Sequence, residues 1–281
     1  MAVVNEFTSS RGTAAVEELL GLLGSEQVRR LDDAHPFSTA FAARDRAAVG
    51  GVLTDRQARR VAELEAIALM LRRHRPDWSA HRSHLSDLLV SRDKVGAVLF
   101  ELEVGEYLGR ASKTRWRWAR FNEHAPDWVA DRQHLGVECH RAMSIEKLAN
   151  YGKTLSEKAA QHDKWRGPLV IALGFDGVVP PNVVQRMHRD AQRYLPWMTR
   201  HREVSAVLVF ASQRVTRAPV AAARGGLQLR SQQCTEIRNA NAVHPIRPGL
   251  LGDGPEVFRR TFPGPMKSMN EQINGLTTEE K

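Results

Sequence analysis

The stretch from Ala125 to Met143 constrains the fold of this chain more than any other. Its sequence, APDWVADRQHLGVECHRAM, reads as two short strands joined by a tight polar turn. If Trp128 is paired with Val137 across an antiparallel hairpin, Ala130 meets Leu135 and the shared face is wholly apolar. A shift of one residue would turn this apolar set to the opposite side, so the pattern predicts this register.

The same register places Asp127 directly opposite Glu138 on the other face, with Cβ atoms roughly 5 Å apart. Two carboxylates at that separation repel one another unless a cation or a shared proton lies between them. The hairpin therefore predicts a divalent metal site. An exposed hairpin face with two solvated acids is the alternative that the hairpin alone leaves open.

The net charge of this chain of 281 residues is +9, which indicates the kind of partner it would bind. Its 41 Lys and Arg outnumber 32 Asp and Glu, which favours an anionic partner, and nucleic acid is the commonest large one. An Arg-rich composition without functional meaning is the other explanation. Two cysteines, Cys139 and Cys234, exclude a disulfide framework and suit the reducing cytoplasm. We expect no secretory signal and no membrane-spanning segment, because neither pattern is present.

Three regions are expected along the chain. Residues 1–95 predict an N-terminal helical region, residues 96–265 a second domain, and residues 266–281 a polar tail. In the first region, Thr54 and Gln57 form a capping-box pattern that begins a helix running to Arg75. An amphipathic packing helix is favoured there over a DNA-reading helix-turn-helix.

Residues 96–110 predict a nearly all-round apolar, buried helix. On a helical wheel Glu101 has only apolar and glycine neighbours, whereas Glu103 has polar ones. An ionised carboxylate in an apolar stripe is costly unless something compensates it. Glu101 is therefore the acid that most requires a functional explanation, unless its side chain reaches the helix edge and solvent.

Residues 113–121, KTRWRWARF, alternate basic and aromatic side chains and predict a strand. Trp116 and Trp118 would share one face, and Arg115 and Arg117 the other. The arginines are candidate contacts to nucleic-acid phosphates. Core packing explains the tryptophans equally well.

After the hairpin, a helix is expected over roughly residues 144–165. Leu155, Ala159 and His162 lie in its apolar stripe, with Lys158 and Gln161 on a polar flank. Residues 167–176 form a continuous apolar run, as in a strand covered on both faces, so a β–α–β crossover is predicted. Farther on we expect a basic helix at 182–200 and strands at 204–210 and 227–237.

The order of these elements resembles the core of the PD-(D/E)XK nuclease superfamily, which has a restriction endonuclease-like fold. Pro126-Asp127 matches the PD of the motif, Glu138-Cys139-His140 stands where the family has (D/E)-X-K, and Glu101 matches a helical acid that precedes the sheet in many members. The resemblance covers residues 96–176. It implies an α/β fold with a three-layer core in the order α-β-β-β-α-β.

The same resemblance implies a hydrolase, a DNA-binding nuclease that requires Mg²⁺ (magnesium) or Mn²⁺. Asp127 and Glu138 would bind the metal, with the backbone carbonyl of Cys139 as a third ligand and Glu101 completing the outer shell. A homodimer is one expected assembly, because cutting two strands often needs two sites.

The chain departs from the family at His140, where the motif usually has lysine. His140 would point to the same face as Glu138 and could donate to a phosphate or act as a base. It could equally mark a site that has lost catalysis, and Lys158 could supply the missing cation. A non-catalytic module that binds nucleic acid or a protein partner is therefore the alternative. A zinc site is disfavoured because no ligand pair has the usual spacing among Cys139, His140, His134, Cys234 and His244.

Overall fold

The protein is a mixed α/β chain that divides into two compact units. The computed structural model describes residues 10–112, 114–122, 124–142, 151–162, 164–178, 201–216, 227–246, 251 and 257–263. The first unit comprises Met1–Val98, Arg214–Arg230 and Arg259–Lys281, and the second comprises Leu99–Gln213 and Ser231–Phe258. The helix expected at 182–200 and the tail at 266–281 lie outside the described residues. None of the described helices has the length and apolar character needed to cross a bilayer.

The N-terminal part of the first unit is helical, as the sequence predicts. Its helices are α1 (Ser10–Leu23), α2 (Ser25–Arg29), α3 (Ser38–Ala48), α4 (Asp55–Arg73), α5 (Arg75–Trp78), η1 (Ser79–His81) and α6 (Arg82–Val90). Gly24, at φ 83°, separates α1 from α2. Thr54 caps α4: its side chain accepts the Gln57 N–H, and the Gln57 side chain accepts the Thr54 N–H, so the capping box is confirmed. Helix α4 packs on α1 and α3 through buried residues that include Leu64 and Leu71.

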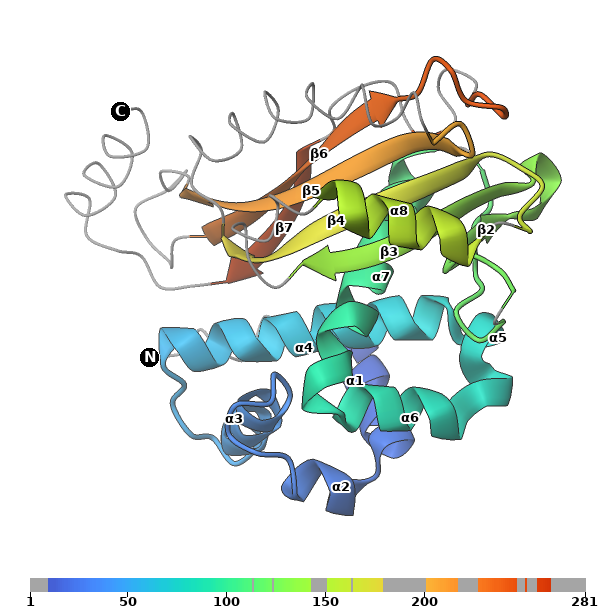
Figure 1. Ribbon diagram of the computed structural model, residues 1–281. Coiled ribbons are helices and arrows are strands. Elements are labelled where there is room, and N and C mark those ends of the chain that lie inside the picture. Colours follow the sequence, from blue (N-terminus) through green and yellow to red (C-terminus); the bar gives the residue numbers. More distant parts are fainter. Residues whose placement is uncertain are drawn as a thin grey trace. The chain divides into compact units, whose positions relative to one another are not determined.

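The remaining elements build the sheet and its two flanking helices (Figure 1). They are α7 (Arg92–Ala111), β1 (Arg117–Trp118), β2 (Trp128–Ala130), η2 (Asp131–Gln133), β3 (Leu135–Ala142), α8 (Tyr151–Gln161), β4 (Leu169–Val178), β5 (Val204–Thr216), β6 (Leu227–Arg238) and β7 (Val257–Pro263). In the described part of the chain the strands follow one another in the order β1-β2-β3-β4-β5-β6-β7. The β1–β2 and β2–β3 pairs are antiparallel, and the β3–β4 and β4–β5 pairs are parallel.

The hairpin has the predicted register. Trp128 pairs with Val137 and Ala130 with Leu135, and all four side chains are buried. His134, at φ 48°, follows η2 and closes the turn. Helix α8 follows β3 and precedes β4 in the chain, and these two strands pair in parallel. The predicted β–α–β crossover is therefore confirmed.

The strand expected over 113–121 is much shorter than predicted, and only Arg117–Trp118 is assigned to β1. The Ala119 N–H still donates to the Asp127 carbonyl, in the register of the β1–β2 pair. The chain then turns, and the Asn122 N–H donates to the Ala119 carbonyl. The predicted alternation of side chains is nevertheless present across this segment. Trp116 and Trp118 are buried, and Arg115 and Arg117 are exposed.

Helices α7 and α8 lie on opposite faces of the sheet (Figure 1). Helix α7 packs closely on β2 because Gly105 has no side chain: a Cβ there would lie 2.1 Å from Trp128 Cζ2. The Trp128 indole also donates to the backbone carbonyl of Glu101, at 2.9 Å. This packing fixes the position of Glu101 relative to β2, which begins directly after Asp127.

Candidate functional site

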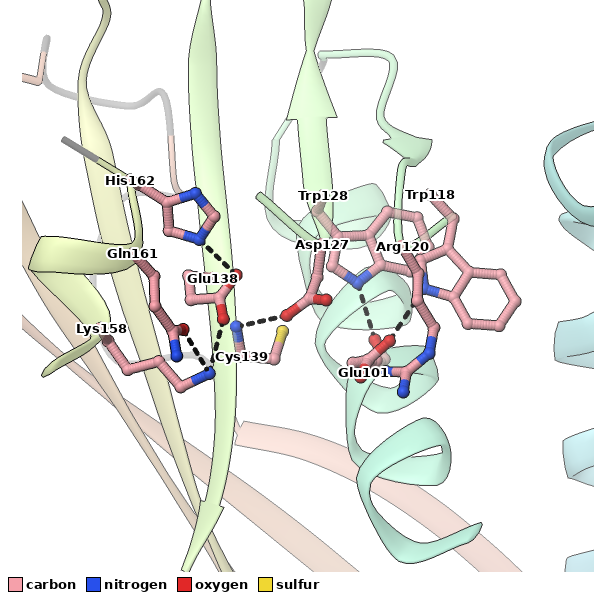
Figure 2. A network of polar contacts seen from close by, with 10 residues as sticks. All are labelled: Glu101, Trp118, Arg120, Asp127, Trp128, Glu138, Cys139, Lys158, Gln161 and His162. Atoms are coloured by element: carbon pink, nitrogen blue, oxygen red, sulfur yellow. Dashed lines mark hydrogen bonds and ion pairs between the residues drawn. The ribbon is translucent and has the colours of Figure 1, made fainter. Parts of the chain in front are cut away.

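Three acidic side chains from different parts of the chain lie together beside the hairpin (Figure 2). Glu101 comes from α7, Asp127 directly precedes β2, and Glu138 lies within β3. Burial raises the pKa of Asp127 well above its ordinary value, and the negative charges of Glu101 and Glu138 raise it further. The structure thus brings together the three acids that the sequence singled out.

Glu101 is buried, with 3% of its surface exposed. The Trp118 indole donates to its Oε2 at 3.1 Å, and the Arg120 guanidinium forms an ion pair with its Oε1. Burial raises the pKa of Glu101 to about 7, although Arg120 and Trp118 act in the opposite direction and Glu138 raises it. Glu103, by contrast, is partly exposed. The helical wheel therefore identified the acid that turns inward.

Asp127 connects the two arms of the hairpin just beyond the Trp128–Val137 pair. Its Oδ2 accepts the backbone N–H of Cys139 at 2.8 Å. The Cys139 thiol is buried, which raises its pKa well above the ordinary value, and Asp127 adds to the effect. The backbone N–H of Cys139 is therefore the group through which this residue contacts Asp127.

Glu138 carries a cationic or imidazole partner on each carboxylate oxygen. Lys158 Nζ donates to its Oε1 at 2.7 Å, and His162 Nε2 lies 2.8 Å from its Oε2. Burial alone would raise the pKa of Glu138, but the His162 hydrogen bond and the Lys158 charge outweigh burial and lower it. Lys158 also donates to Gln161 Oε1 at 3.1 Å, so the two polar residues predicted on the flank of α8 both reach this site (Figure 2).

His140 shares the environment of Glu138 on β3. The side chain is partly exposed. Burial lowers its pKa, the Lys158 charge lowers it further, and Glu138 acts in the opposite direction. Burial and the Lys158 charge therefore both favour the neutral imidazole of His140.

Two partners of the acids were missed in the sequence. His162 was expected in the apolar stripe of α8, but its ring contacts Glu138. It follows Lys158 by four residues and therefore shares its helical face, which is a signal that could have identified it. Arg120 follows Trp118 by two residues, so continued strand alternation would have placed it on the same face.

The arginines predicted to contact nucleic acid lie elsewhere. Arg117 forms a two-pronged contact with Asp131 of η2, at 3.0 and 3.2 Å. The hydrogen bond from Arg117 lowers the pKa of Asp131, and the nearby charges of Arg117, His134 and Arg115 contribute. These arginines therefore lie at the turn of the hairpin and outside the carboxylate cluster.

The fit of the carboxylates to a metal is mixed. Among the described residues, no group of three or more His, Cys, Asp or Glu side chains has an arrangement that could hold a metal ion. Both oxygens of Glu138 instead contact Lys158 and His162. The donor type suits Mg²⁺, because this ion binds oxygen and is commonly held by one or two protein carboxylates plus waters. Asp127 and Glu138 thus fit Mg²⁺ by their chemistry, while their present partners would compete with it.

Comparisons of the chain with protein-family models, with curated proteins and with solved structures found no match.

Proposed function

We propose that this protein is a metal-dependent nuclease that hydrolyses phosphodiester bonds, with DNA as the favoured substrate. One observation supports this most strongly: Glu101, Asp127 and Glu138 converge, with Lys158 reaching them from the next helix. Glu101 lies on α7, Asp127 directly before β2, Glu138 on β3 and Lys158 on α8. This order of elements resembles the restriction endonuclease-like core.

The electrostatics of the cluster favour a cation. The raised pKa values of Asp127 and Glu101 indicate that their negative charges lack full compensation, even with Arg120 nearby. Such acids either take up a proton or bind a positive ion. A divalent ion held by Asp127 and Glu138, with the Cys139 carbonyl as a further donor and Glu101 in the outer shell, would supply the missing charge.

When bound, Mg²⁺ or Mn²⁺ would provide Lewis acidity and lower the pKa of a coordinated water. The side chains of the chain itself would supply the other functions. The Lys158 ammonium is placed to stabilise negative charge on a phosphate, and Gln161 orients it. His140, with its lowered pKa, is suited to accept a proton from the attacking water. Lys158 would thus take over the charge of the family lysine, and His140 the proton transfer.

The test is cleavage of DNA by the purified protein with Mg²⁺ and with chelator. Asp127→Asn and Glu138→Gln should each lower the cleavage rate by roughly 10²-fold or more, because losing a metal ligand removes several kcal/mol of transition-state stabilisation. Glu103→Gln is the matched control, since Glu103 is a partly exposed acid on α7 that lies outside the carboxylate cluster. Full activity in Asp127→Asn, or no metal-dependent cleavage by the wild-type protein, would contradict the proposal.

A second candidate function is a nuclease-like module that binds nucleic acid without cutting it. It is favoured by the two contacts that occupy Glu138 and by histidine at the position of the motif lysine. In that case DNA binding would persist, while calorimetry would detect no Mg²⁺ binding that depends on Asp127.

A further inference from the structure

We propose that the hairpin-turn edge of the sheet in the second unit binds the phosphate backbone of nucleic acid, away from the carboxylate cluster. The inference rests on the proposed function and adds a second substrate contact to it. The edge, named here the basic edge, consists of Arg115, Arg117, Arg132, His134, Lys164 and Arg166, all of them exposed.

Strand directions bring these residues to one end of the sheet. Strand β1 is antiparallel to β2, β2 is antiparallel to β3, and β3 is parallel to β4. The start of β1, the end of β2 and the starts of β3 and β4 therefore share one edge. The segment before β1, the hairpin turn and the segment before β4 all meet there.

Contacts confirm that these segments are adjacent. Gly136 N–H donates to the Pro168 carbonyl at 2.9 Å, which joins the start of β3 to the segment before β4. Gly167 lies so close to the turn that a Cβ would be 2.0 Å from the His134 carbonyl oxygen. On the other side of the turn, Asp131 accepts a hydrogen bond from Arg117. The charges of Arg115 and His134 act on the same carboxylate and lower its pKa.

The charge of this edge is strongly unbalanced. Five lysine and arginine side chains share this end of the sheet with Asp131, and Arg117 already pairs with that acid. Asp163 lies outside the described residues. Exposed like charges repel one another, so a surface of this kind is best matched by a polyanion. Arg132, Lys164 and Arg166 are the members whose positive charges would gain most from such a partner.

The position of the edge favours a nucleic-acid backbone. Asp131 follows Asp127 by four residues of nearly extended chain, a separation of roughly 10–13 Å. A DNA strand advances about 3.4 Å along the duplex axis per nucleotide. With the hairpin aligned along that axis, the edge would meet phosphates about three or four nucleotides from the one at the carboxylates. Trp116 and Trp118 are buried and cannot stack on bases. The contact would be made to phosphates, which carry no sequence information, so it is expected to be insensitive to sequence.

The experiment compares two triple variants that remove the same charge. Arg132→Gln/Lys164→Gln/Arg166→Gln neutralises the basic edge, and Arg29→Gln/Arg46→Gln/Lys94→Gln neutralises three exposed cations of the first unit. Binding of a fluorescent DNA duplex is measured by anisotropy over a range of salt concentrations. The edge variant should lower affinity at least about tenfold and reduce the log–log salt slope by roughly two to three, since each lost phosphate contact removes about 0.9. The control should change neither.

Each outcome decides the proposal. An unchanged salt slope in the edge variant, equal weakening in both variants, or wild-type binding to polyglutamate as tight as to the duplex would overturn it. Arg132→Lys/Arg166→Lys keeps the charge and should keep the binding, which separates charge from damage to the fold. Binding is measured without cleavage, so the two proposals can fail separately. If the edge variant loses affinity while the wild-type protein cuts nothing, the nuclease proposal fails and the basic edge stands.

Discussion

At the scale of single residues, the site is defined by how each acid is compensated. Glu138 has a lowered pKa because Lys158 and His162 stabilise its negative charge, whereas Glu101 and Asp127 have raised pKa values. Neighbouring carboxyl groups with opposite shifts are typical of sites that handle protons or cations. His140 lies on the same side as Lys158 and loses basicity through burial and that charge.

His140→Lys tests the role given to this histidine. We expect cleavage to fall, because a lysine at this position is protonated near neutral pH and cannot accept a proton. The wild-type rate should rise with pH through a pKa below the ordinary histidine value, since burial and Lys158 lower the pKa of His140. Initial rates across the pH range measure both effects. Equal or higher activity in His140→Lys, with a flat pH profile, would instead assign His140 a role as a cation.

Glu101 makes the stability of the protein depend on pH. Its pKa is raised from 4.5 to about 7, so the folded state binds the proton more tightly than the unfolded state does. The free energy of unfolding should therefore decrease as pH rises from about 4.5 to about 7 and then level off. The full shift, which already includes the opposing effect of Arg120, corresponds to about 3 kcal/mol.

Glu101→Gln should weaken this dependence, because an amide does not ionise. Urea unfolding near pH 5 and pH 8 measures the difference in the free energy of unfolding. Glu103→Gln, on the same helix but partly exposed, is the control and should retain the wild-type dependence. Equal slopes in the wild type and in Glu101→Gln would show that Glu101 is already ionised at low pH.

At the scale of elements, close packing between α7 and β2 positions the cluster. Gly105 allows the helix to approach Trp128, whose indole donates to the Glu101 carbonyl. The Trp118 and Trp128 rings stack with centroids 6.1 Å apart, and Trp118 also donates to the Glu101 carboxylate. The two tryptophans therefore act as core residues that also hold an acid in place.

Gly105→Ala should disturb this arrangement. The added methyl group would meet Trp128 Cζ2 at 2.1 Å, and overpacking of this kind costs about 1–3 kcal/mol. Gly109→Ala lies one turn farther along the same helix with open space around it, and helix propensity predicts a stabilisation of up to about 1 kcal/mol. Thermal or urea unfolding of both variants measures the contrast. Equal stability in the two variants would show that the helix can move away from β2 at little cost.

At the scale of the whole molecule, charge and connectivity suggest how a substrate would be held. The net charge of +9 does not by itself locate a binding surface. The antiparallel and parallel pairings collect Arg132, Lys164 and Arg166 at one end of the second unit. The carboxylates lie farther along the hairpin, so binding and chemistry would occupy separate parts of the same strands.

Local pattern determined much of this architecture. Alternation alone predicted the pairing of Trp128 with Val137, because one register buries every apolar side chain of the hairpin. Helical periodicity identified Glu101 as the inward acid of α7, and the Thr54 capping box marked the start of α4. Each of these features depends on residues close together in the chain or on a two-strand register.

Only the tertiary structure decided that Arg120 and His162 are partners of the acids. Arg120 reaches Glu101 because β1 ends early and the chain turns after Ala119. His162 reaches Glu138 because α8 crosses the face of β3, although its spacing in sequence also suited an apolar stripe. Periodicity specifies the face on which a side chain lies, but the partner it meets depends on the packing of distant elements. The sequence alone therefore identified the acids and Lys158, and the fold added Arg120 and His162 as their further partners.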